Sequence, residues 1–371
     1  MRILICPDSF KGTLSAGDAA RAMEKGARRV FGKETVISLL PLGDGGEGSL
    51  DCFVTAGAVE KKTVVTGPYG ERLDARWLLF PDRKTAYVES AEAAGLTRTE
   101  RRETALATSY GVGELIREAS EDAEEILLGL GGSATSDMGL GMAAALGFTF
   151  RDEEGKSFLP TGATLSRVAS FEKPRGRLPA IRALSDVENP LCGPLGAAAV
   201  FGPQKGADEK TVSMLDRGMR KASALIDAEK ADLPGAGAAG GMGYAVLALL
   251  NGGLGPGIEE IARVIGLEEA VREADCVLSG EGSFDRQSLM GKAVGGVAKL
   301  AKRYGVPLFV LSGIAKADPA VYEKGVAAVL PLTRYRLGSL PGPEETAEAL
   351  EDHTEALFRA VTAAGLSFSR R

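Results

Sequence analysis

The sequence predicts a two-domain α/β protein, and three observations carry that prediction. The chain has 371 residues, which is enough for two separate hydrophobic cores. Short apolar runs alternate with helical segments near both ends, whereas period-two strands occupy residues 61–90. Glycine is abundant at 49 residues and aromatic residues are scarce, as in α/β folds with many tight turns. We therefore expect residues 1–60 and 272–371 to form one discontinuous α/β domain. Residues 61–271 then form a second α/β domain that contains a β-meander.

Composition excludes several classes of protein. The net charge of −6 argues against a general nucleic-acid partner, which requires a basic face. The uncharged interval 233–258 is interrupted by glycines and prolines, so we expect no membrane span. The four cysteines are far apart and form no CxxC, which favours buried thiols in a reducing compartment. With no signal-peptide pattern after Met1, we expect a cytoplasmic protein. The oligomeric state is left open, a homodimer included.

The chain begins with a compact apolar strand over residues 2–6. Asp8 and Lys11 lie in the loop that follows, at the edge of an α/β sheet where ligands usually bind. A local ion pair between the two side chains is the alternative. Ser15 is expected to cap a helix that runs to residue 31, and residues 35–40 form a second strand.

A loop with several glycines follows the second strand over residues 41–49. Its carboxylates, Asp44 and Glu47, are of the type that holds Mg²⁺ or accepts a proton from a substrate. A solvated turn is the alternative interpretation. Helices are expected at residues 51–55 and 104–119, on either side of the β-meander.

The most informative stretch begins with a buried strand at residues 126–130. A turn of small residues follows, and helical character returns from about Asp137. Strand, glycine turn and helix together aim backbone N–H groups at an anion, aided by the helix dipole. Tight packing is the alternative use of such a turn, and Asp137 could cap the helix or help to hold a cation. The candidate phosphate contacts are Gly131, Gly132, Ser133 and Thr135.

Two further loops carry candidate polar groups. The strand at residues 181–184 ends just before Asp186, an acidic residue in a loop that terminates in proline. Lys205 lies in the small loop 202–206, where it either neutralises phosphate or is a surface lysine. The expected helices that follow are 208–230 and 238–251.

In the last third of the chain, polar side chains crowd beyond a strand at residues 276–278. These side chains are Glu281, Asp285, Ser288 and Lys292. The only histidine, His353, lies mid-helix among acidic residues and is expected to be solvated. General-base work must then fall to a carboxylate or a lysine, which excludes Ser-His-Asp and Cys-His chemistry. The remaining expected elements are the helix 260–274, the strands 307–311 and 326–330, and the closing helix 344–364.

Seven short motifs, in order and spread along nearly the whole chain, resemble those of the two-domain bacterial glycerate kinase family. They occupy residues 8–12 (DSFKG), 41–48 (PLGDGGEG), 131–135 (GGSAT), 185–191 (SDVENPL), 202–206 (GPQKG), 234–243 (PGAGAAGGMG) and 280–282 (GEG). The resemblance implies transfer of a phosphoryl group from ATP to D-glycerate with Mg²⁺, with 2-phosphoglycerate favoured over 3-phosphoglycerate. It also implies a Rossmann- or flavodoxin-like domain beside a second α/β domain, with the active site in the cleft between them.

On that resemblance we assign candidate roles. The catalytic candidates are Asp186, Lys11, Asp44 and Lys292, with Asp186 the first choice for the base. Asp8, Glu281 and Asp285 join the 131–135 turn as nucleotide-binding candidates, and Asp44, Glu281 and Asp186 are candidates for Mg²⁺.

The chain also departs from the family pattern. Met138 stands where the family usually has glycine, and Arg334 and Arg336 lie in an atypical segment, where either could clamp a substrate carboxylate. The alternatives are a kinase of the same fold for another small hydroxy acid, a catalytically inactive nucleotide-binding protein, and a flavodoxin-like electron carrier.

Overall fold

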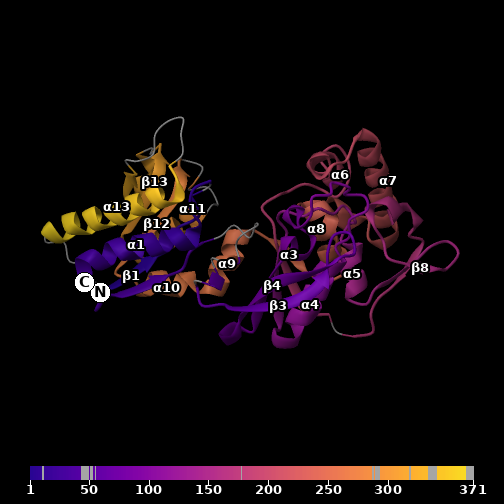
Figure 1. Cartoon of the computed structure of the whole chain (residues 1–371), viewed down its shortest axis with the longest axis horizontal. Coiled ribbons are helices and arrows are strands. Elements are labelled where there is room, and N and C mark those ends of the chain that lie inside the picture. The colour runs from indigo at the N-terminus through magenta and orange to yellow at the C-terminus, as the bar shows by residue number, and fades with distance from the viewer. Residues whose placement is uncertain are drawn as a thin grey trace. The chain divides into compact units, whose positions relative to one another are not determined.

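The chain divides into two compact units (Figure 1). Unit 1 comprises Met1–Asp44, Asp51–Gly57 and Ile258–Arg371, and unit 2 comprises Gly45–Leu50 and Ala58–Gly257. The domain boundaries expected from the sequence, after residues 60 and 271, stay a prediction. The computed structural model describes residues 1–10, 12–42, 50, 53–54, 56–176, 178–285, 288, 293–316, 319–332 and 341–364, with the side chains of 258 and 259 excepted.

Unit 1 is built, within its described residues, on a five-stranded sheet of order β14-β13-β12-β1-β2. Every neighbouring pair in this sheet is parallel. Its strands are β1 (Arg2–Ile5), β2 (Val36–Leu39), β12 (Cys276–Phe284), β13 (Leu308–Ala315) and β14 (Val326–Pro331). Strand order reverses at β1, because β2 lies on one side of it and β12 on the other. Such a reversal creates a crevice at the carboxyl ends of the two strands.

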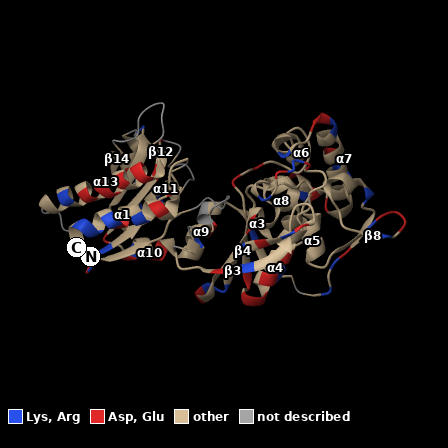
Figure 2. Cartoon of the chain, viewed as in Figure 1, with Lys and Arg blue, Asp and Glu red and all other residues tan. Residues whose placement is uncertain are grey.

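Helices cover both faces of this sheet. On one face α1 and α13 pack together over Ile3, Ile5 and Leu278. Figure 2 shows basic and acidic residues along both helices, and an ion pair joins Arg29 to Glu351 at 2.7 Å. α1 begins as expected, because the Ser15 side chain accepts a hydrogen bond from the Asp18 N–H. The helices are α1 (Ala16–Phe31), α9 (Gly257–Ile265), α10 (Leu267–Glu273), α11 (Ala293–Tyr304), α12 (Ala320–Glu323) and α13 (Pro343–Ala363).

Unit 2 contains a mixed sheet, six-stranded in its described residues, of order β11-β10-β6-β5-β4-β3. The expected β-meander is confirmed, since β3, β4 and β5 pair antiparallel. From β5 onward the pairing is parallel, so the carboxyl ends of β5, β6 and β10 share one edge. The strands are β3 (Val59–Thr66), β4 (Arg72–Phe80), β5 (Thr85–Glu89), β6 (Glu125–Gly129), β10 (Ala180–Leu184) and β11 (Gly253–Gly255), with a small separate sheet of β7 (Thr149–Arg151), β8 (Ser157–Phe158) and β9 (Ser170–Glu172).

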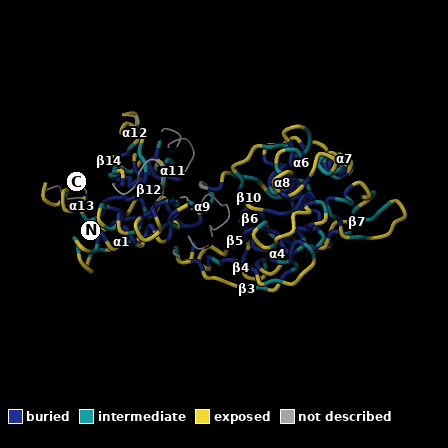
Figure 3. Tube along the Cα trace, turned by 45° about the horizontal axis from the view of Figure 1, so that its top comes forward, coloured by how far each residue is buried: buried dark blue, intermediate teal, exposed yellow. Residues whose placement is uncertain are grey.

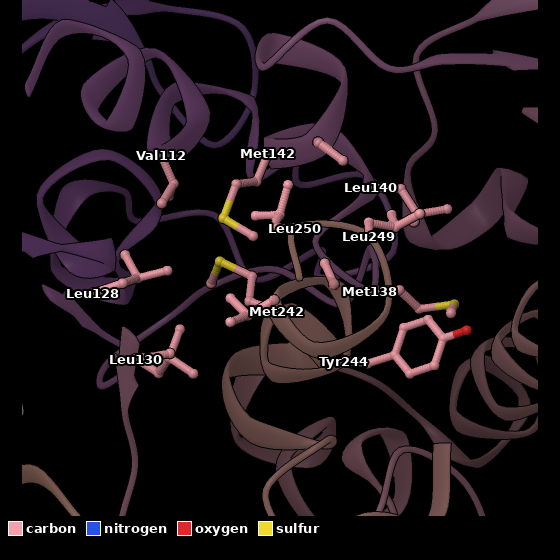
Figure 4. Close-up of a cluster of buried hydrophobic side chains, with 14 of the residues drawn as sticks. Val112, Leu128, Leu130, Met138, Leu140, Met142, Met242, Tyr244, Leu249 and Leu250 are labelled. Carbon is pink, nitrogen blue, oxygen red and sulfur yellow. The ribbon is translucent and has the colours of Figure 1, made fainter. Parts of the chain in front are cut away.

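Apolar residues from strands and helices form one core in unit 2. Figure 3 shows its central strands buried, and Figure 4 shows the part of the core that contains Leu130, Met138 and Met242. The helices that supply it are α3 (Ser90–Ala94), α4 (Tyr110–Asp122), α5 (Leu140–Ala145), α6 (Ala197–Phe201), α7 (Glu209–Ile226) and α8 (Ala238–Ala248).

The structure corrects three of the expected elements. The single helix expected over 260–274 is two helices, because Gly266 adopts a φ of 71° between α9 and α10. The helix expected from residue 104 begins only at Tyr110, since the Ser109 N–H donates to a side chain outside the helix. The strand expected to end at residue 278 continues to Phe284, because it pairs with β13 as far as Ala315.

Two expected absences can be compared with the described residues. Cys6, Cys192 and Cys276 are free thiols, and Cys52 lies outside the described residues. Within the described part of the chain, no helix combines the length and the hydropathy that crossing a bilayer requires.

Candidate active site

The first cluster of candidate residues lies where strand order reverses in unit 1. Beyond the end of β1 the chain continues to follow β12, and the Asp8 N–H donates to the Gly280 carbonyl at 2.8 Å. Asp8 therefore lies next to Glu281, which is only 9% exposed and pairs with Ser312 of β13. The structure thus brings together two carboxylates, from the motifs at 8–12 and 280–282, at the usual ligand edge of such a sheet.

A third motif begins at the same place. The Leu42 N–H donates to the Pro7 carbonyl at 2.8 Å, so the loop after β2 begins beside the loop after β1. The catalytic candidates Lys11, Asp44 and Lys292 lie outside the described residues. Arg334 and Arg336 also lie outside them.

Asp285 has a local structural role in this unit. Its N–H donates to Ser288 Oγ at 3.1 Å, and its Oδ1 accepts from the Ser288 N–H at 3.3 Å. Two such reciprocal bonds close a tight turn. The sequence predicts that Glu281 lies in a polar cluster beyond the end of a strand. Because β12 runs to Phe284, Glu281 is instead part of the strand.

The second cluster lies at the carboxyl edge of the parallel strands of unit 2, around residues 131–135, which we call the 131–135 loop. Main-chain bonds hold it against the segment after α3, with Leu96 N–H to Gly132 O at 2.8 Å and Ala134 N–H to Ala94 O at 2.7 Å. Gly132 is exposed and has a φ of 70°. The N–H groups of Gly131, Gly132 and Ser133 have no acceptor among the described residues. Consecutive N–H groups of this kind make an anion-binding concavity.

Packing behind the loop explains another glycine motif. Gly240 has a φ of 69°, and a Cβ there would lie 2.0 Å from the Thr135 carbonyl oxygen. The Met138 N–H donates to the Gly240 carbonyl at 3.1 Å. The glycines at 240 and 241 therefore let α8 approach the 131–135 loop, and Met138 fits within the buried core. Tight packing therefore explains the glycines where α8 meets the 131–135 loop.

Asp137 is held by hydrogen bonds within the fold, and its role in holding a cation stays a prediction. Its carboxylate is fully buried and accepts from the Ser109 N–H at 2.7 Å, from Ser109 Oγ at 2.8 Å and from the Gly139 N–H at 3.1 Å. Burial raises the pKa of Asp137, while these hydrogen bonds act in the opposite direction. α5 begins only at Leu140, later than the sequence indicates, and lies in the core; the alignment of its dipole with the loop stays a prediction.

Lys205 lies beneath the same loop. Its side chain is contributed by the short 3₁₀ helix Pro203–Lys205 and is buried, with the residue 3% exposed. Nζ donates to Ser133 Oγ at 2.9 Å and to the Thr135 carbonyl at 2.8 Å. Burial lowers the pKa of Lys205 to about 7, although the negative charge of Asp137 opposes the shift. The interpretation of Lys205 as a surface lysine is therefore wrong.

Asp186 lies at the same sheet edge as the 131–135 loop. Leu184 of β10 pairs with Gly129 of β6, so Asp186 and Gly131 each follow a paired residue by two positions. Asp186 is exposed, and its Oδ1 accepts a hydrogen bond from the Gly257 N–H at 3.2 Å. The other carboxylate oxygen has no hydrogen-bond partner among the described residues.

Glu89 is a further carboxylate at this edge, and it was not among the site residues predicted from the sequence. Glu89 ends β5 and pairs in register with Gly129, yet it is only 2% exposed. Asp186 was predicted because polar residues at the carboxyl ends of parallel strands often bind ligands. Glu89 lies at such an end, but the prediction requires that residues 85–89 be recognised as a strand of the parallel part of the sheet.

The described residues contain no group of three or more histidine, cysteine, aspartate or glutamate side chains that could hold a metal ion. Such a cage is what calcium or structural zinc requires. Mg²⁺ instead is usually held by one or two carboxylates together with substrate phosphates. The carboxylates of Glu281, within β12, and of Asp186, after β10, fit that requirement, each within its own unit.

A parallel sheet in unit 1 and a mixed sheet in unit 2, each with polar loops after its parallel strands, define an α/β protein. Residues 3–362 match the sequence model of the glycerate kinase family. The chain is 41% identical to glycerate kinase from Halalkalibacterium halodurans and 41% identical to glycerate 2-kinase from Escherichia coli K12, in each case over 89% of this chain and 90% of the relative.

A solved structure is similar over the whole length. The crystal structure of a protein assigned as glycerate kinase 2 from Salmonella typhimurium LT2 matches with a TM-score of 0.87 and 36% identity, covering 99% of this chain and 100% of that one. The chain belongs to the glycerate kinase family, and it is a kinase. The family resemblance and the α/β fold expected from the sequence are confirmed.

Proposed function

We propose that this enzyme transfers the γ-phosphoryl group of ATP to D-glycerate and that the product is 2-phosphoglycerate. The observation that carries the proposal is the match to glycerate kinases along nearly the whole chain, which includes a glycerate 2-kinase at 41% identity. The catalytic task in such a transfer is to position the two reactants in line and to stabilise charge on the phosphates.

The 131–135 loop would supply the phosphate contacts. The N–H groups of Gly131, Gly132 and Ser133 have no acceptor among the described residues, and the buried Thr135 hydroxyl also lacks a partner there. These donors are held in place before any ligand binds, by the bonds to residues 94 and 96 and by the packing of Gly240. Preorganised donors cost no reorganisation when charge develops.

Asp186 is our proposed general base. It lies at the same edge as the loop and is exposed, and the Gly257 N–H orients one of its oxygens. In this role the second oxygen would accept the proton of the attacking hydroxyl group of glycerate. Because the only histidine, His353, bonds the Ala349 carbonyl of its own helix at 2.8 Å, a carboxylate remains the best described candidate.

Asp8 and Glu281 would bind the nucleotide from unit 1. For Asp285, the nucleotide contact predicted from the sequence competes with its structural role in the turn with Ser288. Glu281 and Asp186 are the described carboxylates proposed to hold Mg²⁺, with Asp44 as a further candidate outside the described residues. When bound with the nucleotide, Mg²⁺ neutralises phosphate charge. Lys11 and Lys292 stay proposed charge partners of the phosphates.

The test is ³¹P NMR of the product formed from ATP, Mg²⁺ and D-glycerate. A phosphomonoester coupled to the proton at C2 of glycerate is expected. Coupling to the two protons at C3 would show 3-phosphoglycerate and overturn the assignment of the product. A coupled ADP-release assay across a panel of small hydroxy acids checks the substrate. Faster turnover of another acid, or nucleotide binding without any transfer, would contradict the proposed function.

A further inference from the structure

The buried amine of Lys205 has no anionic partner close by. Its two acceptors, Ser133 Oγ and the Thr135 carbonyl, are both neutral. In the described part of the chain, the hydrogen bonds of its Nζ are to these two atoms, and it forms no ion pair with a carboxylate. The negative charge of Asp137 raises the pKa of the amine, but the Asp137 carboxylate is already bonded to Ser109 and Gly139.

A buried ammonium group without a counter-charge is costly, because water no longer solvates it. This cost lowers the pKa of Lys205 to about 7, so near neutral pH the amine is only partly protonated. A second polar atom in the same place is also unsatisfied, since Thr135 Oγ1 is buried without a hydrogen-bond partner. Lys205 and Thr135 are therefore arranged for a partner that the folded chain itself does not supply.

The exposed side of the loop shows what that partner would be. Ser133 accepts a hydrogen bond from Lys205, which leaves its own hydroxyl hydrogen for another acceptor. The neighbouring N–H groups of Gly131 and Gly132 also lack acceptors among the described residues. An anion bound there would satisfy these donors and place a negative charge above the Lys205 amine.

We propose that Lys205 is a positioning residue for the nucleotide phosphates, which fixes Ser133 and Thr135 from the buried side and supplies the positive charge beneath the bound anion. The proposal rests on the proposed function of the 131–135 loop. It has a consequence that simple packing of Lys205 does not have. A phosphate above the loop favours the charged amine, so nucleotide binding takes up a proton.

The test measures that proton directly. Titration calorimetry of MgADP binding is performed at pH 8 in two buffers that differ in ionisation enthalpy. The wild-type protein is expected to take up protons when it binds MgADP, up to one per nucleotide, because an amine of pKa about 7 is mostly neutral at pH 8. Lys205→Arg, which is always charged, is expected to bind MgADP with no uptake.

Lys205→Met removes both the charge and the hydrogen bonds. It is expected to weaken MgADP binding at least about 10-fold and to raise KM for ATP by a similar factor, with KM for glycerate changed less than about 3-fold. Lys221→Met is the matched control, because Lys221 is an exposed lysine of α7 whose ion pair with Glu153 lies on the surface. It should behave as the wild type in both measurements.

Absence of proton uptake by the wild type, or equal uptake by Lys205→Arg, would overturn the proposal. Unchanged MgADP affinity in Lys205→Met would do the same. If Lys205→Met does not fold, the proton uptake of the wild type compared with that of Lys205→Arg still tests the proposal. Turnover of D-glycerate is measured separately, so a protein that takes up the proton but phosphorylates no glycerate would contradict the proposed function and leave the role of Lys205 standing.

Discussion

The carboxyl edges of the two sheets differ in the kind of polar group that they present. The edge of unit 2 presents the N–H groups of the 131–135 loop, with the Lys205 amine beneath them, in addition to the carboxylates of Asp186 and Glu89. The edge of unit 1 presents the carboxylates of Asp8 and Glu281, placed by direct pairing of the chain after β1 with β12. Donors suit phosphate oxygens and carboxylates suit cations. The two edges therefore differ in chemistry, although both lie at the carboxyl ends of parallel strands.

The two edges also differ in how they are held. In unit 1 the ladder of adjacent strands carries Asp8 and Glu281 into place. The 131–135 loop of unit 2 depends instead on side chains and glycines from distant segments, above all Lys205 and Gly240. Substitutions of those supporting residues should therefore alter the conformation of the loop although the loop sequence is unchanged. Four predictions test the polar groups and the supports of the two edges.

The largest effect is expected from Asp186→Asn, which tests whether the unit 2 edge carries a catalytic carboxylate besides its donors. We expect kcat to fall by ~10²–10⁴-fold while ATP binding is kept, because the amide cannot accept the substrate proton. Steady-state kinetics and nucleotide titration measure the two quantities. Asp122→Asn, at an exposed position at the end of α4, is the control and should leave kcat unchanged. Near-normal turnover by Asp186→Asn would remove it from the role of base.

Gly240→Ala tests the support of the loop, and Gly305→Ala, at the end of α11, is its control. The two glycines have similar φ values, 69° and 66°, but only Gly240 faces an obstacle, the Thr135 carbonyl oxygen at 2.0 Å. Gly305→Ala should cost about 1–2 kcal/mol of unfolding free energy from backbone strain alone. Gly240→Ala should cost at least ~3 kcal/mol, because the loop must also move. Equal losses in urea unfolding would show that the close approach contributes nothing.

The pH dependence of stability tests the buried amine of Lys205. Its pKa is lowered from 10.5 to about 7 by folding, so the unfolded chain binds more protons between those values. Stability of the nucleotide-free protein must therefore gain from this group as pH rises, by about 2 kcal/mol from pH 7 to pH 9. Urea unfolding of wild type and Lys205→Met at both pH values measures the difference. An equal pH dependence in the two proteins would show that the amine stays solvated.

The smallest effect is expected from Asp285→Asn in unit 1. If Asp285 serves the turn with Ser288, asparagine can make the same bonds, and the unfolding free energy should change by less than ~0.5 kcal/mol. KM for ATP should then change less than about 3-fold. A 10-fold rise in KM for ATP with unchanged stability would instead support the nucleotide contact predicted from the sequence.

Much of the fold could be predicted because its signals are local. The strand at β6, the Ser15 cap of α1 and the meander β3–β5 each follow from periodicity or capping within a short segment. The placement of Asp8 and Asp186 at strand ends followed in the same way, because it requires only the end of an apolar run. Element ends were less predictable, since pairing with β13 extended β12 and a positive φ at Gly266 divided one helix into two.

The sequence by itself determined the glycine loops, the strand-end carboxylates and the family to which the chain belongs. Only the tertiary structure decided what lies behind those loops. Lys205 is 72 residues from Ser133 in the chain, and Gly240 contacts Thr135 from a different helix, so no local pattern could connect them. Burial of Asp137 and Lys205 was equally invisible, because the exposure of a charged side chain depends on which distant segments pack over it. Local propensity specifies the elements, whereas the long-range packing of those elements sets the surroundings, and therefore the chemistry, of each polar group.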